Sequence, residues 1–202
     1  MHTRRMNVNV LRRRALVAGP AFAALALLGC GRESSGQGDS KAASVPVSVE
    51  AIEQQAKGFS LGSAMAARVI YVFFDPQCPH CAALWEAVRP LRGRARFVWI
   101  PVALLNDKSA PQGATILAAA DPVEAMDRHE TSLRSQQGGI TASGVTDELK
   151  AAIQRNTRLM DSFGFSSVPT AVGKHAVTGE LTTLEGSAPT EAVAQRFGLA
   201  GG

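Results

Sequence analysis

Runs of apolar, β-branched and aromatic residues mark the strands that this chain is expected to form. The longest run, Val69 to Phe74, is unbroken, which is typical of a strand buried on both faces in the middle of a sheet. A second run, Arg96 to Ile100, stops at Pro101. Two later segments, Val168 to Val172 and Glu180 to Leu184, have the same strand-forming composition. The pattern therefore predicts four strands, with the first of them at the centre.

Helical spacing of apolar residues fills the intervals between these strands. Proline at an early helical position is favourable because its missing N–H would be unpaired there, which places a helix start at Pro79. The stretch from Ala110 to about Phe163 is predominantly helical, with breaks at 121–122 and 136–144. We expect helical segments over Ser48–Lys57, Pro79–Leu91, Ala110–Ala120, Pro122–Leu133, Thr146–Phe163 and Thr190–Phe197. The order β–α–β, helical insert, β–β–α predicts an α/β fold with an inserted helical subdomain at about 103–163.

Basic residues are concentrated at the N-terminus. Five of the 21 Lys and Arg lie within the first 14 positions, where there is no acidic residue. From Cys30 onward, 16 Lys and Arg face 17 Asp and Glu. The overall charge of +4 therefore belongs to the leader, and a nucleic-acid partner is not indicated.

The leader has the parts of an export signal. A basic segment, 1–14, is followed by an apolar run of 14 residues from Ala15 to Leu28, shorter than the roughly 20 residues that span a bilayer. The sequence Leu27-Leu28-Gly29-Cys30 resembles a lipobox, where bacteria lipidate a cysteine and cleave before it. We expect a signal peptide over 1–29 and a flexible, Gly- and Ser-rich tether over 30–47, which would anchor a periplasmic domain to a membrane through Cys30.

Two features of the leader allow a second interpretation. An ordinary cleaved signal, with Cys30 lost or left as a free thiol, is the alternative to lipidation. Arg13-Arg14 loosely resembles a twin-arginine signal, although a plain basic segment for the general export route fits as well. Both routes deliver the chain to a compartment in which disulfides persist.

Cysteine usage identifies the candidate chemistry. The expected catalytic domain, 48–202, contains two cysteines, Cys78 and Cys81, three positions apart. Nothing remains for a structural disulfide framework or a second zinc half-site, and Ala82 excludes the haem motif CxxCH. We therefore expect a redox-active pair that uses no metal and no other cofactor.

The placement of the pair suggests how it reacts. Cys78 precedes a helix, whose unpaired N–H groups and dipole stabilise a thiolate. Cys81, one turn further in, suits the resolving role, in which a second thiol breaks the mixed disulfide. Pro79 and His80 are expected to tune the pair toward a low pKa at Cys78, which makes its disulfide a stronger oxidant.

Other polar residues are harder to assign. His129 and His175 have no motif around them and are expected at the surface. Asp75 either perturbs the redox pair or caps the turn after its strand.

Three segments resemble the DsbG/DsbC family of periplasmic disulfide isomerases: YVFFDPQCPHCAALWEAVRPL, ILAAADPVEAM and NTRLMDSFGFSSVPT. The resemblance runs from about residue 48 to the C-terminus. It implies a thioredoxin-like fold with an inserted helical subdomain, an attacking Cys78 and a resolving Cys81. It also implies that Pro169 follows a cis peptide bond and that the backbone of Val168 pairs with an extended substrate.

Three departures from the family change the expected role. Only 31–47 precede the first expected helix, too little for the family's N-terminal dimerisation domain, so we expect a monomer. Pro79-His80 and Val168 are the choices of the oxidase DsbA, whereas the isomerases have Pro-Tyr or Gly-Tyr and usually Thr. Apolar Val72 stands where thioredoxin has a buried acid, so no proton-transfer carboxylate is expected.

The sequence thus predicts a periplasmic thiol–disulfide oxidoreductase. Its partners would be exported cysteine-containing proteins and an unidentified redox protein that resets the pair. Whether the pair oxidises, isomerises or reduces its substrates is left open. The alternative is a chaperone-like holdase or adaptor in which the thiols are secondary.

Overall fold

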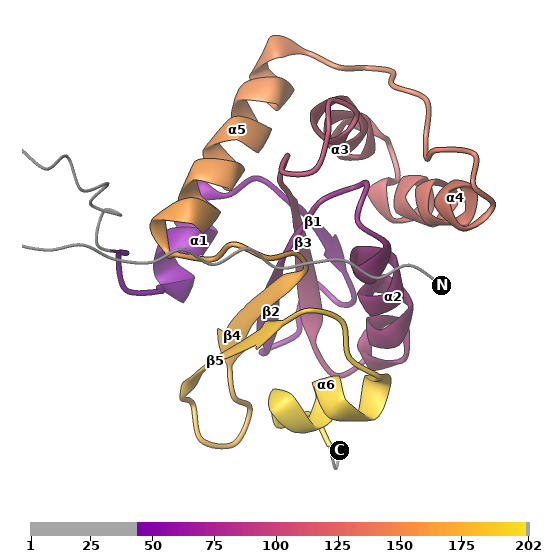
Figure 1. Cartoon of the computed structure of the whole chain (residues 1–202). Coiled ribbons are helices and arrows are strands. Elements are labelled where there is room, and N and C mark those ends of the chain that lie inside the picture. The colour runs from indigo at the N-terminus through magenta and orange to yellow at the C-terminus, as the bar shows by residue number, and fades with distance from the viewer. Residues whose placement is uncertain (1–43, 201–202) are drawn as a thin grey trace, which may run out of the picture. The chain divides into compact units, whose positions relative to one another are not determined.

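A single mixed sheet organises the described part of the chain, residues 44–200 of the computed structural model. The strands are β1 (Phe59–Leu61), β2 (Val69–Phe74), β3 (Arg96–Pro101), β4 (Thr170–Lys174) and β5 (Leu181–Glu185). Their order in the sheet is β1-β3-β2-β4-β5 (Figure 1), with β2 parallel to β3 and the other neighbouring pairs antiparallel. The predicted central position of β2 is confirmed.

Strand β2 is buried on both faces, as its unbroken apolar run predicts. Ile70, Val72 and Phe74 belong to one core cluster, which also contains both cysteines. Tyr71 and Phe73 belong to a second cluster on the opposite face. Successive side chains of a strand point to opposite faces of its sheet, so both clusters are built on one strand.

Helices cover both faces of the sheet (Figure 1). They are α1 (Val49–Gln55), α2 (Pro79–Val88), α3 (Ser109–Ala118), α4 (Pro122–Arg134), α5 (Asp147–Ser162) and α6 (Thr190–Arg196), and a 3₁₀ turn over Arg89–Leu91 extends α2. Helices α2 and α6 contribute to the first cluster, and α1 and α5 to the second. The three helices α3, α4 and α5 lie between β3 and β4 in the chain, which confirms the predicted α/β fold with a helical insert.

Side-chain caps begin two helices of the insert. The side chain of Asp121 accepts a hydrogen bond from the N–H of Glu124 at 3.0 Å, and Thr146 accepts one from Leu149 at 3.2 Å. These contacts pair N–H groups that the first turn of a helix leaves free. They fix where α4 and α5 begin.

The sequence analysis missed strand β1. It has three residues, of which Phe59 and Leu61 are buried, and it pairs antiparallel with β3, Phe59 opposite Trp99. So short a run gives no periodic signal. Strand β4 begins at Thr170 rather than Val168, because Pro169 has no N–H to donate to the ladder.

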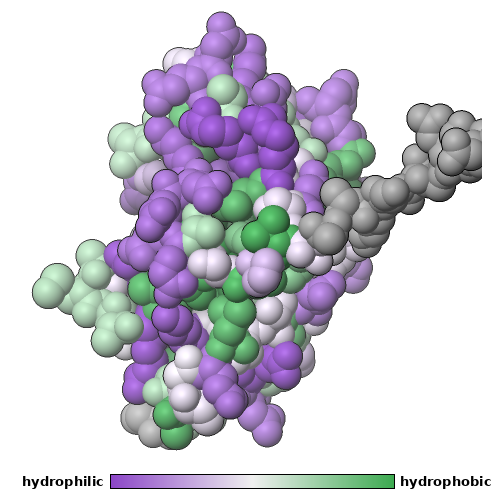
Figure 2. Space-filling model, turned by 90° about the vertical axis from the view of Figure 1, so that its left-hand side faces the viewer, coloured by the Kyte–Doolittle hydropathy of each residue, from purple (hydrophilic) through white to green (hydrophobic). Residues whose placement is uncertain are grey.

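The surface on the side of α1 and α5 is mostly polar, with apolar residues gathered near its middle (Figure 2). Within residues 44–200, no helix has both the length and the apolar character that crossing a membrane requires. The expected leader, Cys30 and most of the tether lie outside the described residues.

Candidate active site

The two cysteines lie at the junction of β2 and α2. Cys78 is the residue that caps the N-terminus of α2, with Pro79 in the first turn, and its side chain is 4% exposed. Cys81 is 0% exposed, and its N–H donates to the carbonyl of Cys78 at 3.0 Å. Both are free thiols. The central strand and the first turn of the helix therefore hold two thiols one turn apart.

The two thiols have opposite acidities. A hydrogen bond from the Cys81 side chain lowers the pKa of Cys78 to about 6, against the opposing effect of burial and with help from the N–H groups of Cys81 and His80 and the charge of His80. Burial raises the pKa of Cys81 well above its usual 9.0, and its contact with Cys78 raises it further. At neutral pH Cys78 is therefore the more readily ionised of the two thiols, and Cys81 holds its proton.

The loop before β4 faces the pair across a groove. The Val168–Pro169 peptide bond is cis, the geometry that the family resemblance implies, and the Cys78 sulfur lies 3.4 Å from the Val168 carbonyl oxygen, to which Cys78 donates when it is protonated. The groove has a volume of about 750 Å³ and is lined by Cys78, Pro79, His80, Leu104, Leu105, Asp161, Gly164, Phe165, Ser166, Ser167 and Val168. Leu104 and Leu105 are large apolar side chains that are 40% and 52% exposed. The arrangement suits an apolar, extended peptide segment.

Asp75 fixes the two loops that border Cys78. Its carboxylate is fully buried and accepts from the N–H of Gln77 at 2.8 Å and the hydroxyl of Ser109 at 2.7 Å. Its other oxygen accepts from the N–H groups of Leu104 and Leu105 at 2.7 and 3.0 Å. Of the two interpretations of Asp75, the structure supports the one in which it caps the turn.

His129 is buried, so the predicted surface position is wrong. Its ring is 0% exposed; Nε2 donates to the carbonyl of Pro76 at 2.6 Å, and Nδ1 accepts from the N–H of Ile140 at 3.0 Å. Burial lowers the pKa of His129, which keeps the ring neutral with one donor and one acceptor. This imidazole ties α4 to the turn just before Cys78. His175, the other histidine expected at the surface, is partly buried.

A buried carboxylate that the sequence analysis missed lies on α4. Val72 indeed places an apolar side chain on the central strand, but Glu130 is 0% exposed and contributes a buried carboxyl group from the helical insert. Burial raises the pKa of Glu130 to about 8. One signal in the sequence could have revealed it, because Glu130 follows Met126 by four positions and so continues the buried stripe of α4.

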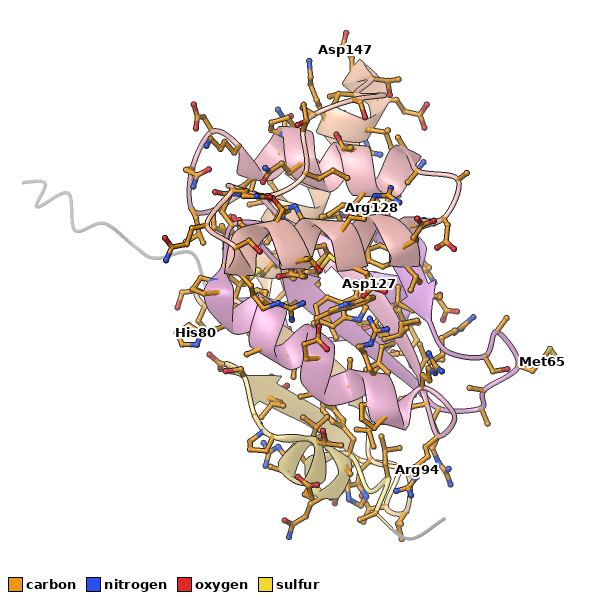
Figure 3. The ribbon with its side chains drawn as sticks, turned by 90° about the vertical axis from the view of Figure 1, so that its right-hand side faces the viewer. Met65, His80, Arg94, Asp127, Arg128 and Asp147 are labelled. Atoms are coloured by element: carbon orange, nitrogen blue, oxygen red, sulfur yellow. The ribbon has the colours of Figure 1, made fainter. Side chains whose placement is uncertain are left out.

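His80, which the sequence analysis expects to tune the pair, is exposed at the start of α2, where Figure 3 shows it at the molecular edge. Within residues 44–200, no three His, Cys, Asp or Glu side chains are grouped so as to hold a metal ion. The chemistry that the arrangement supports is thiol–disulfide exchange at Cys78.

A CxxC pair at the N-terminus of the helix after a central strand, opposite a cis-proline, defines a thioredoxin-like thiol–disulfide protein. A family model described as Thioredoxin matches residues 54–170, and the chain belongs to this family.

Individual relatives agree with this assignment. The thiol:disulfide interchange protein DsbG of Pseudomonas aeruginosa is 29% identical over 151 residues, which are 72% of this chain and 57% of that protein. DsbG of Escherichia coli is 30% identical over 103 residues, 50% of this chain and 41% of that protein. The similarity to DsbG is thereby confirmed, and the chain spans about half the length of these curated relatives.

A solved structure shows the same fold. ScsC of Proteus mirabilis, in a compact conformation, matches with a TM-score of 0.60 at 18% identity, covering 80% of this chain and 84% of that one. At this identity the likeness concerns the arrangement of helices and strands.

Proposed function

We propose that this protein is an exported thiol–disulfide oxidoreductase in which Cys78 attacks and Cys81 resolves. The observation that carries the proposal is the Cys78 thiol at the start of α2, whose pKa is lowered to about 6. At pH 7 about nine-tenths of such a thiol is thiolate, the form that reacts with disulfides.

The exchange proceeds in two displacements. In the oxidising direction a substrate thiolate attacks the sulfur of Cys78, the Cys78–Cys81 bond breaks, and Cys81 leaves as a thiolate and takes up a proton. A second substrate thiolate then attacks the substrate sulfur of this mixed disulfide, which forms the substrate's disulfide and releases Cys78 as a thiolate. The substrate loses two electrons and the pair gains them, so a redox partner must reoxidise the pair.

The substrates that the groove favours are exported proteins with a cysteine in an extended, apolar segment. Leu104 and Leu105 supply exposed apolar surface beside Cys78, and Val168 supplies backbone groups for a strand-like pairing. Pro79 and His80 border the same groove and complete the proposed site. Replacing the resolving cysteine tests the proposal, because a C81A variant cannot release a mixed disulfide.

We therefore expect the full-chain C30S/C81A variant, incubated with disulfide-bonded exported proteins, to accumulate mixed disulfides at Cys78. Replacing Cys30 ensures that the redox pair carries the reacting thiols. C30S/C78A/C81A is the matched control and should trap nothing. Equal trapping by both variants would contradict the proposed role of Cys78.

The direction of exchange is set by the reduction potential of the pair. The lowered pKa of Cys78 stabilises the reduced form, which favours an oxidant. A potential near about −120 mV in glutathione buffers would support this direction, whereas one near about −270 mV would assign the pair to reduction.

Export to the periplasm, lipidation of Cys30 and a monomeric state are further parts of the proposal. Metabolic labelling with a fatty acid, compared between the wild type and C30S, tests the anchor. Light scattering of the detergent-solubilised full chain tests the oligomeric state. If C78A protects unfolded proteins from aggregation as well as the wild type does, and trapping by C81A fails, the holdase alternative replaces the enzyme.

A further inference from the structure

Glu130 is a buried acid without a hydrogen-bond partner. Its side chain, near the middle of α4, is 0% exposed, and neither carboxylate oxygen has a hydrogen-bond partner. Burying a carboxylate in this way costs free energy, and nearly all buried polar groups in proteins are paired. A costly group that nothing in the packing requires is a candidate for a role in the chemistry nearby.

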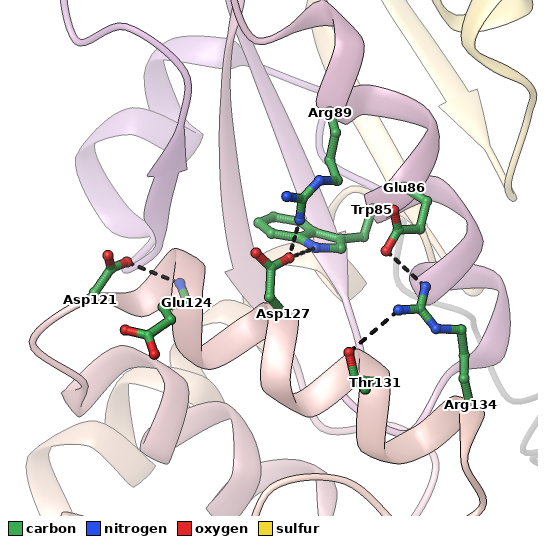
Figure 4. A network of polar contacts seen from close by, with 8 residues as sticks. All are labelled: Trp85, Glu86, Arg89, Asp121, Glu124, Asp127, Thr131 and Arg134. Carbon is green, nitrogen blue, oxygen red and sulfur yellow. Dashed lines mark hydrogen bonds and ion pairs between the residues drawn. The ribbon is translucent and has the colours of Figure 1, made fainter.

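The neighbours of Glu130 on α4 show that it faces α2. One turn before it, Asp127 accepts from the indole N–H of Trp85 at 2.8 Å and pairs with Arg89 (Figure 4). One turn after it, Arg134 pairs with Glu86 at 2.7 Å. Residues three and four apart share one face of a helix. Glu130 therefore lies between two contacts that join α4 to α2, and Figure 3 shows the two helices next to each other.

The same face of α4 approaches the redox pair. Met126, one turn before Glu130, packs in the core cluster that contains Cys78 and Cys81. His129, the preceding residue, binds the carbonyl of Pro76, two positions before Cys78. The buried carboxyl group of Glu130 thus lies on the part of α4 that reaches both the core cluster, through Met126, and the turn before Cys78, through His129.

Burial, together with the negative charges nearby, keeps Glu130 protonated near neutral pH. Burial is the largest cause of its raised pKa, about 8, and the negative charges of Cys78, Glu86 and Asp127 add to it. Arg134 acts in the opposite direction, but its guanidinium is engaged by Glu86. In return, the charge of Glu130 raises the pKa of Cys81.

We propose that Glu130 exchanges a proton with Cys81 whenever Cys81 changes between thiol and thiolate. The proposal rests on the exchange reaction proposed above and adds the path of its proton. Neither carboxylate oxygen is engaged in another hydrogen bond, so both are available to take up the proton. Glu130 is accordingly a positioning residue for the proton of Cys81 and does not touch the substrate.

The resolving step then balances within the pair. Cys81 gives its proton to the Glu130 carboxylate, and the Cys81 thiolate attacks the sulfur of Cys78 in the mixed disulfide. The Cys78–Cys81 bond forms, the Cys78–substrate bond breaks, and the substrate leaves as a thiolate. In the oxidising direction the protonated Glu130 returns the proton to the departing Cys81 thiolate.

The two steps can be followed separately with Ellman's disulfide, dithiobis(nitrobenzoate), and the reduced full chain carrying C30S. The first thionitrobenzoate is released when Cys78 attacks, and the second when Cys81 resolves the mixed disulfide. We expect the rate of the second phase to rise about tenfold per pH unit up to about pH 8 and then to flatten, because above that pH Glu130 is ionised and the fraction of Cys81 that has passed its proton to Glu130 no longer changes with pH. In E130Q the rise should continue without a break, which makes E130Q about tenfold faster than the wild type at pH 9.

Two variants separate this role from a structural one. E130D should restore the change of slope near pH 8. D127N, which neutralises another carboxylate of α4, should leave the change of slope of the C30S parent protein in place. Coincident, unbroken profiles for the parent and E130Q would overturn the role of Glu130 while leaving the exchange reaction intact. An unbroken parent profile overturns it even if E130Q does not fold. Absence of the first phase would overturn the proposed reaction and, with it, this inference.

Discussion

When the Cys78–Cys81 pair is reduced, the free energy of unfolding of this protein should depend on pH through the ionisation of Cys78. The fold lowers the pKa of that thiol from 9.0 to about 6. Between these values the unfolded chain binds a proton at Cys78 that the folded protein does not, so stability rises with pH. The contribution is fully present above pH 9 and is lost as the pH falls through 6.

The size of this contribution follows from the shift. A difference of one unit in pKa corresponds to about 1.4 kcal/mol, so the thiolate adds about 4 kcal/mol above pH 9 and about 1.4 kcal/mol at pH 7. Cys78 is 4% exposed, so solvent screens little of it. Glu130 acts with the opposite sign: its pKa is raised from 4.5 to about 8, so its proton stabilises the folded state below pH 4.5 and this stabilisation is lost as the pH rises through 8.

Urea unfolding of the reduced full chain from pH 5 to pH 9 measures the effect. The free energy of unfolding of C30S minus that of C30S/C78A reports Cys78 together with its coupling to Cys81 and Glu130, because the other titrating groups occur in both variants. The difference should grow by about 1.4 kcal/mol between pH 5 and pH 7 and by a further 2 to 3 kcal/mol up to pH 9. A difference that stays flat over this range would refute the argument that the fold stabilises the Cys78 thiolate.

Two substitutions test the scaffold around the pair. D75N should lower the free energy of unfolding in urea by about 3 kcal/mol, because the N–H groups of residues 104 and 105, which donate to the carboxylate of Asp75 in the wild type, would face an amide group instead. An unchanged midpoint of urea unfolding would contradict this role of Asp75. G139A should destabilise the protein by about 2 kcal/mol, since Gly139 has a φ of 90° and an added Cβ would lie 2.6 Å from the His129 ring. Its control, G93A, adds a Cβ that meets nothing within 4 Å. Equal thermal unfolding temperatures for the two variants would contradict the claim that a Cβ at position 139 is strained against the His129 ring.

Local signals in the sequence predicted the elements that carry the site. The run Val69 to Phe74 indicated a strand buried on both faces, and Pro79 marked the start of the following helix, as the structure has them. These predictions succeed because burial on both faces and the missing N–H of proline act over a few adjacent residues. The family resemblance supplied what no local signal shows, the cis geometry at Pro169.

The parts that the sequence did not reveal depend on contacts between distant segments. His129 is buried because the turn at Pro76 and the N–H of Ile140 both reach its ring, 53 and 11 positions away. The spacing of Glu130 from Met126 places it on the buried stripe of α4, but that α2 covers this stripe follows from contacts between the two helices. Strand β1 exists because β3 offers it a free edge. Each is a consequence of tertiary packing, which overrides the usual preference of charged and polar residues for the surface.

The most direct test of the account is the pH dependence of alkylation of the reduced C30S full chain by iodoacetamide, with the labelled cysteine located by peptide mass spectrometry. The account predicts fast labelling of Cys78 with a midpoint at about pH 6, little labelling of Cys81, and no fast phase in C30S/C78A. A midpoint near pH 9, or labelling of Cys81 before Cys78, would contradict the claim that Cys78 is the attacking thiolate.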